Sequence, residues 1–262
     1  MESGMIISNT RLVNDYFKVT FYAPEICATA RAGHFVHIKI AHADELVLRR
    51  PFSICNVSPS SGELEVIYKV VGSGTRVLST LRPGEVCDLL GPLGKPFSRP
   101  ADDEFPVAIA GGYGSAAMYM LTREAKIGGA ALLGARNRED ILLADAYRTA
   151  GFEVDVATDD GSAGHKGLVT DLVDDVLRRH AGQKLRFFAC GPTPMLMAVC
   201  RLMLDRGYPD AEVSLDHLMC CGVGACFACV VKIKADNPDG YYYARTCSEG
   251  PVFKVKDVYL EK

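Results

Sequence analysis

The middle of the chain carries the stretch VAIAGGYG at residues 107–114. Four small apolar residues in a row predict a short buried strand, and the glycines after it predict a tight turn into a helix that runs to residue 126. Apolar strands and helical patterns continue to alternate as far as Leu215. The expected strands span residues 130–134, 154–157, 185–189 and 212–215, and the expected helices span residues 140–150, 168–180 and 195–205. This alternation predicts a parallel sheet covered by helices on both faces.

The residues before this stretch follow a different pattern. Apolar and polar side chains alternate in residues 34–40 and 63–71, and turn-forming pairs such as Ala32-Gly33 separate the segments. Short alternating strands with regular turns predict a small antiparallel β-barrel. We expect one helix within it, at residues 75–81. The polar stretch at residues 97–104 is typical of a linker.

After Leu215 the alternation stops, and the remaining residues are rich in cysteine and glycine. A segment this short cannot bury a self-sufficient core, so it needs an internal staple. The sequence therefore predicts a multidomain α+β protein. We expect an antiparallel β-barrel in residues 1–100, an α/β parallel-sheet nucleotide domain in residues 101–215 and a small stapled segment in residues 216–262.

Composition narrows the possible functions. The chain has 262 residues, a net charge of −3, 48% hydrophobic and 23% charged residues, which is ordinary for a globular protein. Charges of both signs are mixed without a basic block, so we expect no nucleic-acid binding. The N-terminus lacks the pattern of a signal peptide, and the apolar runs are too short to span a bilayer. We therefore expect a cytoplasmic protein without a membrane segment.

Ten cysteines are many for such a chain, and in a reducing cytosol they should not form structural disulfides. The motif CGVGACFAC at residues 221–229 is followed after seventeen residues by another cysteine. This is the C-x4-C-x2-C…C spacing of plant-type 2Fe–2S proteins, and glycines inside the loop allow it to wrap a cluster tightly. The predicted metal ligands are Cys221, Cys226, Cys229 and Cys247.

Two alternatives to this ligand set are weaker. A structural zinc site usually takes two short C-x2-4-C pairs, and only Cys226 and Cys229 form a tight pair. Use of Cys220 would lengthen the first spacing to C-x5-C, so we interpret Cys220 as a packing residue. The six histidines show no ligand spacing.

Two segments of the predicted barrel are typical of a flavin site. Arg50-Pro51-Phe52-Ser53 lies where a strand should begin, and it offers a guanidinium for a pyrophosphate and a hydroxyl for a ring nitrogen. Gly72-Ser73-Gly74-Thr75 lies at the start of the predicted helix, where free amides attract phosphate. Taken alone, either segment also fits an ordinary strand start or helix cap.

Together with residues 67–69, these segments resemble the flavin-contacting parts of the ferredoxin reductase superfamily. The stretches TDDGSAGHKG at residues 158–167, MCCGVGAC at 219–226 and EGPVF at 249–253 narrow the resemblance. They are similar to the electron-transfer subunits of class 1B dihydroorotate dehydrogenase. The resemblance runs from about Arg11 to Phe253, nearly the whole chain.

The resemblance implies a division of labour. The barrel would hold FAD, the second domain would receive NAD(H), and the C-terminal segment would hold the 2Fe–2S cluster. A separate catalytic subunit would carry FMN and oxidise dihydroorotate in pyrimidine biosynthesis, in a heterotetramer with two copies of each subunit. Carried over position by position, the expected FAD contacts are Arg50, Pro51, Phe52, Ser53, Ile67, Tyr68, Lys69, Gly74 and Thr75.

Two other functions remain open at this point. The same relay of flavin and cluster could serve another partner enzyme, of the sulfite reductase or hydrogenase type. A zinc-stapled binding module without redox activity is the alternative from a different class.

The expected nicotinamide site lies at the strand ends of the second domain. Gly111, Gly112 and Gly114 form a turn where the backbone can approach a pyrophosphate. The family usually has three consecutive glycines, and Tyr113 stands at the third position here. Cys190 ends the fourth strand, where the superfamily places a cysteine near the nicotinamide, although a buried small residue is common at a strand end. Asp159 follows the third strand and would repel a 2′-phosphate, which predicts NAD over NADP.

Overall fold

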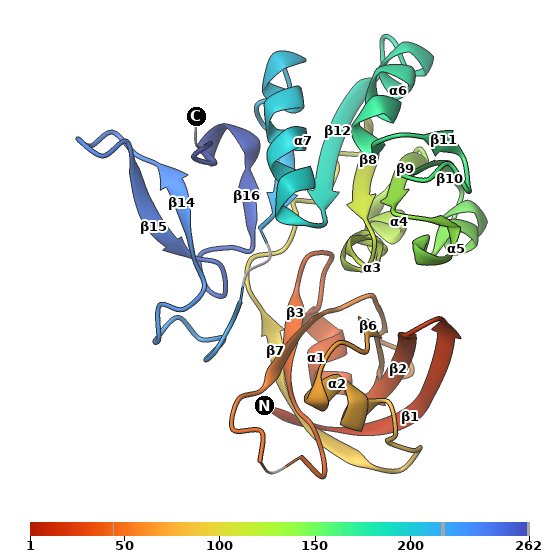
Figure 1. Cartoon of the computed structure of the whole chain (residues 1–262), viewed down its shortest axis with the longest axis vertical. Coiled ribbons are helices and arrows are strands. Elements are labelled where there is room, and N and C mark those ends of the chain that lie inside the picture. Colours follow the sequence, from red (N-terminus) through yellow and green to blue (C-terminus); the bar gives the residue numbers. More distant parts are fainter. Residues whose placement is uncertain (44, 216–217, 261–262) are drawn as a thin grey trace.

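The computed structural model describes residues 1–43, 45–215 and 218–260. These residues form two seven-stranded sheets and a separate two-stranded hairpin (Figure 1). Among the helices of this described part, none is long and apolar enough to cross a membrane.

The first sheet is antiparallel throughout, in the order β4-β3-β7-β1-β2-β6-β5. Its edge strands β4 and β5 are almost consecutive in the chain, so the bend between them brings the two edges together and closes a barrel, as predicted. Its elements are β1 (Glu2–Val13), β2 (Tyr16–Tyr22), α1 (Pro24–Thr29), β3 (Phe35–Lys39), β4 (Arg50–Ser53), β5 (Asn56–Ser58), β6 (Glu63–Lys69), α2 (Ser73–Leu78) and β7 (Val86–Leu93).

Two details of the barrel differ from the prediction. The helix α2 begins at Ser73 and ends at Leu78, so Gly74 and Thr75 belong to its first turn. The Thr75 hydroxyl accepts the amide of Val71 at 2.9 Å and the amide of Gly72 at 3.1 Å, which stabilises the earlier start. The helix is short, because the chain turns at Ser79 toward β7.

The predicted linker is also partly wrong. Phe97 is fully buried, and its ring packs edge-on against Phe188 with centroids 5.6 Å apart. Its amide donates to the carbonyl of Ala32 at 2.9 Å. Phe97 therefore joins the barrel to the second sheet. Only the residues between Phe97 and Glu104 form a polar connection.

The second sheet has the order β11-β10-β9-β8-β12-β13-β16 and is parallel except for β16. Three of the helices predicted for this domain, which were expected to end at residues 126, 150 and 180, each form two shorter helical segments. Its strands are β8 (Glu104–Gly111), β9 (Gly129–Ala135), β10 (Phe152–Thr158), β11 (His165–Lys166), β12 (Lys184–Cys190) and β13 (Glu212–Ser214). The helices are α3 (Gly114–Met118), α4 (Leu121–Glu124), α5 (Ala144–Thr149), α6 (Val173–Arg179) and α7 (Thr193–Asp205), with 3-10 turns η1 (Arg138–Asp140) and η2 (Val169–Leu172).

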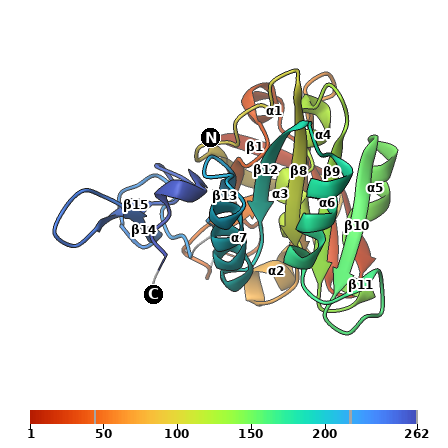
Figure 2. The ribbon, with the colours of Figure 1, turned by 90° about the horizontal axis from the view of Figure 1, so that it is seen from above.

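Alternate residues of β8 face opposite sides of this sheet. Val107 and Ile109 lie in a core that α6 and α7 cover, and Figure 2 shows these two helices on one side of the sheet. Ala108 and Ala110 belong to a second core that continues into the barrel. The barrel and the parallel sheet therefore share one continuous apolar interior.

The C-terminal segment attaches to both larger units. The strands β14 (Val230–Lys234) and β15 (Tyr241–Arg245) form the separate hairpin, while β16 (Val252–Lys254) pairs with β13 and precedes the turn η3 (Val255–Asp257). Lys95 of the barrel side donates to the carbonyl of Gly250 at 2.6 Å, and Leu215 donates to the carbonyl of Pro251 at 2.8 Å. The motif at residues 249–253 thus anchors the segment. The predicted boundary at residue 216 lies outside the described residues.

Candidate functional site

The base of the β14–β15 hairpin places two predicted ligands side by side. Cys229 immediately precedes β14, and Cys247 follows β15 by two residues. The amide of Thr246 donates to the carbonyl of Cys229 at 2.9 Å, which fixes the two chain ends against each other. Both cysteines are 2% exposed, and Phe35 of β3 packs against them.

The other two predicted ligands lie on the loop between β13 and β14, which we call the cluster loop (residues 218–229). Gly222 and Gly224 have φ angles of 72° and 79°, which glycine adopts without strain. With these turns, the amide of Val223 points to the sulfur of Cys221 at 3.5 Å, and the amide of Gly224 points to the sulfur of Cys247 at 3.2 Å. The loop therefore supplies backbone donors to sulfur.

The thiols of Cys221 and Cys247 differ in their readiness to ionise. Burial opposes ionisation of Cys221, but the amides of Val223, Cys226 and Ala225 outweigh it and lower its pKa to about 6. Burial and the neighbouring Cys229 instead raise the pKa of Cys247 to about 11. A buried thiolate pair needs a compensating positive charge, which bound iron supplies.

Buried polar atoms without a protein partner also surround this loop. Among the described residues, no hydrogen-bond partner is found for either ring nitrogen of His37 or for the hydroxyl of Thr246. Both side chains are fully buried. The described part of the chain holds no group of three His, Cys, Asp or Glu side chains arranged around one metal ion. Backbone amides donate to the sulfurs of Cys221 and Cys247, and four thiolates are the ligand set of a 2Fe–2S group, so this donor set fits such a cluster.

Arg245 is a site residue that our sequence reasoning missed. Its guanidinium donates to the carbonyl of Gly224 at 3.0 Å, pairs with Glu249 at 2.7 Å and lies 5.0 Å from the ring centre of Phe227. It ties β15 to the cluster loop. The opposite charges of Arg245 and Glu249 flank Cys247 symmetrically in the sequence, and that pattern is the signal that could have revealed it.

The structure brings the predicted flavin residues together from three elements, namely β4, β6 and α2. A Cβ atom added at Gly74 would lie 3.3 Å from Nε of Arg50, so the guanidinium reaches the first turn of α2. The rings of Phe52 and Tyr68 meet edge-on with centroids 5.9 Å apart. Arg50 through Ser53 are half-buried, whereas Ile67, Tyr68, Gly74 and Thr75 are buried. The guanidinium of Arg50 and the first turn of α2 therefore lie close enough to act on one ligand phosphate, which fits FAD.

Lys69 is engaged on another side of the barrel. Its ammonium lies 3.5 Å from Asp140 of η1 and 4.7 Å from the ring centre of Tyr16. These contacts join the barrel to the second sheet. A flavin contact by Lys69 stays a prediction.

A small cavity connects the flavin strand with the cluster loop. It has a volume of about 30 Å³ and is lined by Pro51, Phe52 and Ser53 of β4, by Ser214 of β13 and by Met219 of the cluster loop. All three parts of the molecule therefore meet beside β4.

The predicted nicotinamide residues meet at the carboxyl ends of β8 and β12. A Cβ atom at Gly114 would lie 2.2 Å from the carbonyl oxygen of Cys190, and one at Gly111 would lie 2.7 Å from the sulfur of Met195. Only glycines allow this approach of the two strand ends. Cys190 is buried, with 5% of its surface exposed.

The substitution of the third glycine causes no backbone strain. The positive φ angle of 54° falls on Gly112, while Tyr113 has φ −68°, which any residue adopts, and its side chain is 53% exposed. Asp159 is exposed just beyond β10, and its amide donates to the carbonyl of Ala135 at 3.1 Å. The glycine turn and Asp159 thus both lie at the carboxyl ends of strands, where ligands of parallel sheets bind.

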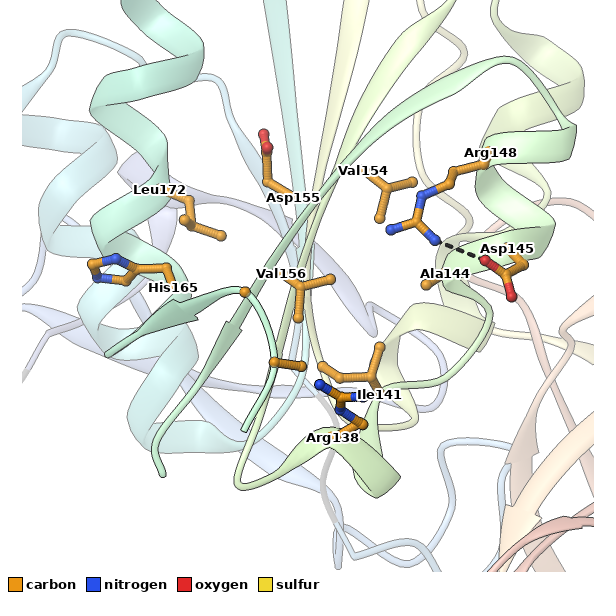
Figure 3. A pocket seen from close by; sticks show the side chains of 12 residues that line it. Arg138, Ile141, Ala144, Asp145, Arg148, Val154, Asp155, Val156, His165 and Leu172 are labelled. Atoms are coloured by element: carbon orange, nitrogen blue, oxygen red, sulfur yellow. Dashed lines mark hydrogen bonds and ion pairs between the residues drawn. The ribbon is translucent and has the colours of Figure 1, made fainter. Parts of the chain in front are cut away.

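A cavity of about 700 Å³ lies away from these residues, beside β10 and α5 (Figure 3). Its polar side chains are engaged: Arg148 pairs with Asp145 at 2.7 Å, Arg138 donates to the carbonyl of Ser162, and His165 lies 3.3 Å from Asp171. None of the predicted site residues lines it. We therefore assign it no part in the site.

Comparisons with known proteins agree with this geometry. Residues 4–97 match the family model described as an oxidoreductase FAD-binding domain, and residues 216–259 match the iron-sulfur cluster binding domain of dihydroorotate dehydrogenase B. The fold and both sites therefore define a flavin and iron–sulfur oxidoreductase.

Curated relatives identify the family. The dihydroorotate dehydrogenase B (NAD(+)) electron transfer subunit of Shouchella clausii is 34% identical, over 97% of this chain and 96% of its own length. The subunit of the same description from Desulforamulus reducens is 38% identical, over 92% of this chain and 90% of its own length. The chain belongs to the family of dihydroorotate dehydrogenase B electron transfer subunits.

Solved structures support the architecture. The NADH-dependent reduced ferredoxin-NADP oxidoreductase of flavin-based electron bifurcation has a TM-score of 0.82 and 28% identity, over 98% of this chain and 90% of its own. A ferredoxin NADP+ reductase from Neisseria gonorrhoeae with bound FAD and NADP, at 15% identity and TM-score 0.64 over 78% and 91%, shares the fold.

The predicted family, fold class and electron-transfer function are confirmed. So are the predicted cofactors, which are FAD, a 2Fe–2S cluster and NAD(H). The relatives named here give no support to the alternative partner of the sulfite reductase or hydrogenase type. The iron–sulfur family match likewise disfavours the zinc-stapled module.

Proposed function

We propose that this chain links NAD(H) to a dihydroorotate dehydrogenase catalytic subunit that carries FMN, in a cytoplasmic heterotetramer with two copies of each subunit. The overall reaction is dihydroorotate plus NAD⁺ giving orotate, NADH and a proton, a step of pyrimidine biosynthesis. The cytoplasmic location is proposed because cluster ligands need reduced thiols, which a reducing compartment maintains.

The observation that carries this proposal is the meeting of flavin strand and cluster loop. β3 pairs with β4, and Phe35 of β3 packs against Cys229 and Cys247. Electron transfer needs close cofactors, and in this arrangement one strand, β3, contacts both the flavin strand and two of the predicted cluster ligands. FAD, when bound, exchanges two electrons as a hydride with NAD(H) and one at a time with an iron–sulfur cluster.

On the flavin side, we assign binding and orientation to the chain's own groups. Arg50 is placed to pair with the pyrophosphate beside Gly74, while Pro51 to Ser53 form the wall next to the ring system. We assign the inner side of the same site to three buried residues, Ile67, Tyr68 and Thr75. The cluster itself is assigned to Cys221, Cys226, Cys229 and Cys247.

On the nicotinamide side, we assign the backbone of Gly111, Gly112 and Gly114 to the pyrophosphate and Cys190 to the neighbourhood of the nicotinamide ring. Asp159 disfavours a 2′-phosphate through charge repulsion. We expect NADH to reduce the bound flavin much faster than NADPH does, as measured by stopped-flow bleaching of the flavin band. A clear preference for NADPH would refute the assignment of Asp159.

The partner is tested by co-expression with a dihydroorotate dehydrogenase B catalytic subunit. We expect a stable complex with FMN, FAD and cluster absorption, in which dihydroorotate reduces NAD⁺. Mass photometry of that complex checks the two-to-two stoichiometry.

The matched control is the same complex assembled with a Cys247→Ala variant. It should retain oxidation of dihydroorotate by an artificial acceptor and lose the reduction of NAD⁺. A complex without NAD⁺ reduction, although all cofactors are present, would contradict the proposed partner.

A further inference from the structure

His37 lies on β3, between the predicted flavin strand and the cluster loop. Its backbone pairs with Pro51 of β4 on one side and with Leu90 of β7 on the other. Its ring is fully buried and lies 5.6 Å, centre to centre, from the ring of Phe35 on the same face of the strand. The residue is thus a direct neighbour of the predicted flavin strand.

The imidazole points at the cluster loop. A Cβ atom added at Gly222 would lie 2.7 Å from Cε1, 2.9 Å from Nδ1 and 3.0 Å from Nε2 of His37. The outer edge of the ring therefore faces Gly222, the residue that follows Cys221. Any side chain at position 222 would separate the ring from the loop.

Neither ring nitrogen has a hydrogen-bond partner among the described residues. A buried polar group without a hydrogen-bond partner lowers the free energy of unfolding by about 1–3 kcal/mol. A histidine at this position is therefore unfavourable unless another group satisfies its ring. Burial, with Arg49 nearby, lowers the pKa of His37 to about 4, and the neutral ring keeps one N–H donor. A bound group with an acceptor atom beside the ring would satisfy this donor.

Sulfur of the iron–sulfur centre is the acceptor that this location offers. The cluster loop wraps the side that the ring faces, and Phe35, two residues before His37, covers Cys229 and Cys247 from the same strand. Hydrogen bonds to sulfur are a principal means by which proteins adjust the potential of such centres.

We propose that His37 is a positioning residue of the iron–sulfur centre, whose imidazole donates a hydrogen bond to sulfur in that centre and raises its reduction potential. The reduced centre carries one more negative charge than the oxidised one, so a fixed donor stabilises it more. This inference rests on the proposed placement of the cluster on Cys221, Cys226, Cys229 and Cys247.

The first test replaces His37 in the full chain with the cluster and FAD bound. His37→Met keeps a long buried side chain without a donor, and His37→Gln keeps an N–H donor. We expect His37→Met to lower the equilibrium constant for reduction of the centre about tenfold, which is about 59 mV for a one-electron couple. His37→Gln should recover most of that shift, and the flavin potential should stay unchanged in both.

His180→Met is the matched control. His180 is also a buried histidine with an unpartnered ring nitrogen, but it stacks on Phe105 in the α/β domain. Its replacement should leave the potential of the centre at the wild-type value. An equal shift in His180→Met and His37→Met would mean a general loss of stability and would overturn the proposal.

A second test needs no variant. Wild-type chain is prepared with histidine labelled by the heavy nitrogen isotope, and pulsed electron paramagnetic resonance is recorded on the reduced centre. We expect a coupling to histidine nitrogen. A normal signal of the reduced centre without that coupling overturns the role of His37, whereas absence of the signal itself refutes the proposed cluster. The two failures are therefore distinguishable, even if His37→Met does not fold.

Discussion

The flavin strand β4 and the cluster loop lie next to each other but are held in different ways. Each residue of β4 pairs with a residue of β3 in a regular antiparallel ladder, so the barrel itself determines its shape. The cluster loop forms no helix or strand, and Val223, Cys226 and Phe227 are exposed. The protein core supports the flavin strand, while the loop, which carries three of the four proposed cluster ligands, has no such ladder. This difference predicts that substitutions at the cluster loop and at the flavin strand affect cluster content and FAD binding separately.

The largest effect is expected from removing a buried cluster ligand. Cys247→Ala should reduce the iron content from about two atoms per chain to nearly none, because four thiolates are needed for the two irons. The barrel should stay folded and keep FAD, since its ladder does not involve the loop. Iron and sulfide analysis together with the visible spectrum measures this.

Cys220→Ser is the matched control for that experiment, because Cys220 is the direct neighbour of Cys221. We expect it to retain the full cluster content. A loss equal to that of Cys247→Ala would show that the ligand set is different from the proposed one.

The next effect concerns the junction of the two sheets, which the protein alone holds together. Glu212 is 6% exposed, pairs with Arg186 at 2.8 Å and accepts the amide of Ser98 at 2.8 Å. Glu212→Ala removes the only carboxylate that the described residues show on the largely buried Arg186, which keeps just the Ser98 hydroxyl at 3.1 Å, and should lower the free energy of unfolding by about 3 kcal/mol. Chemical denaturation of the protein with its cofactors bound measures the loss.

An exposed ion pair offers the comparison. Lys184 lies 3.4 Å from Asp103 at the surface, and Lys184→Ala should change the unfolding free energy by less than about 1 kcal/mol. Equal losses for Glu212→Ala and Lys184→Ala would contradict the importance of burial at the junction.

A smaller and more local effect is expected at the flavin strand. Arg50→Ala removes the guanidinium beside Gly74 and should weaken FAD binding about 10- to 100-fold, the range of a hydrogen bond to a charged group. The cluster should remain. Fluorescence titration of the apoprotein with FAD determines the dissociation constant.

Arg49 serves as the control for Arg50, because its guanidinium is already bound to Asp88. Arg49→Ala should change the FAD dissociation constant by less than about threefold, which is less than 1 kcal/mol. If both variants lose FAD equally, the assignment of Arg50 to the pyrophosphate is wrong.

The smallest effect is expected at the nicotinamide turn. Tyr113 already has a helical backbone conformation, so a glycine there relieves no strain. Tyr113→Gly should therefore change the KM for NADH by less than about threefold, under 1 kcal/mol. Steady-state reduction of an artificial acceptor tests this, and a larger improvement would mean that the tyrosine side chain obstructs the site.

The sequence predicted the features that depend on local patterns. Alternation over residues 63–71 predicted β6, and the change of period after Glu104 predicted the parallel sheet, because burial of one face or of both determines how apolar and polar side chains follow one another. The spacing of the four cysteines predicted the cluster ligands for a similar reason, since one short loop must reach two irons.

Features that depend on contacts between distant residues were not accessible in this way. Phe97 was assigned to a polar linker, although Phe188, far along the chain, completes its environment. The start of α2 was placed too late, because a side chain inside the helix caps the first turn. Arg245 was overlooked, since its role requires the folded cluster loop.

By itself, the sequence determined the three successive units, the ligand spacing and the family resemblance. Only the tertiary structure decided that β3, the neighbour of the flavin strand, packs against the cluster loop and that the ring of His37 faces Gly222. The physical reason is that a periodic pattern records which face of an element is buried, but not which element buries it. Residues 37 and 222 meet because the barrel, the parallel sheet and the C-terminal segment pack together.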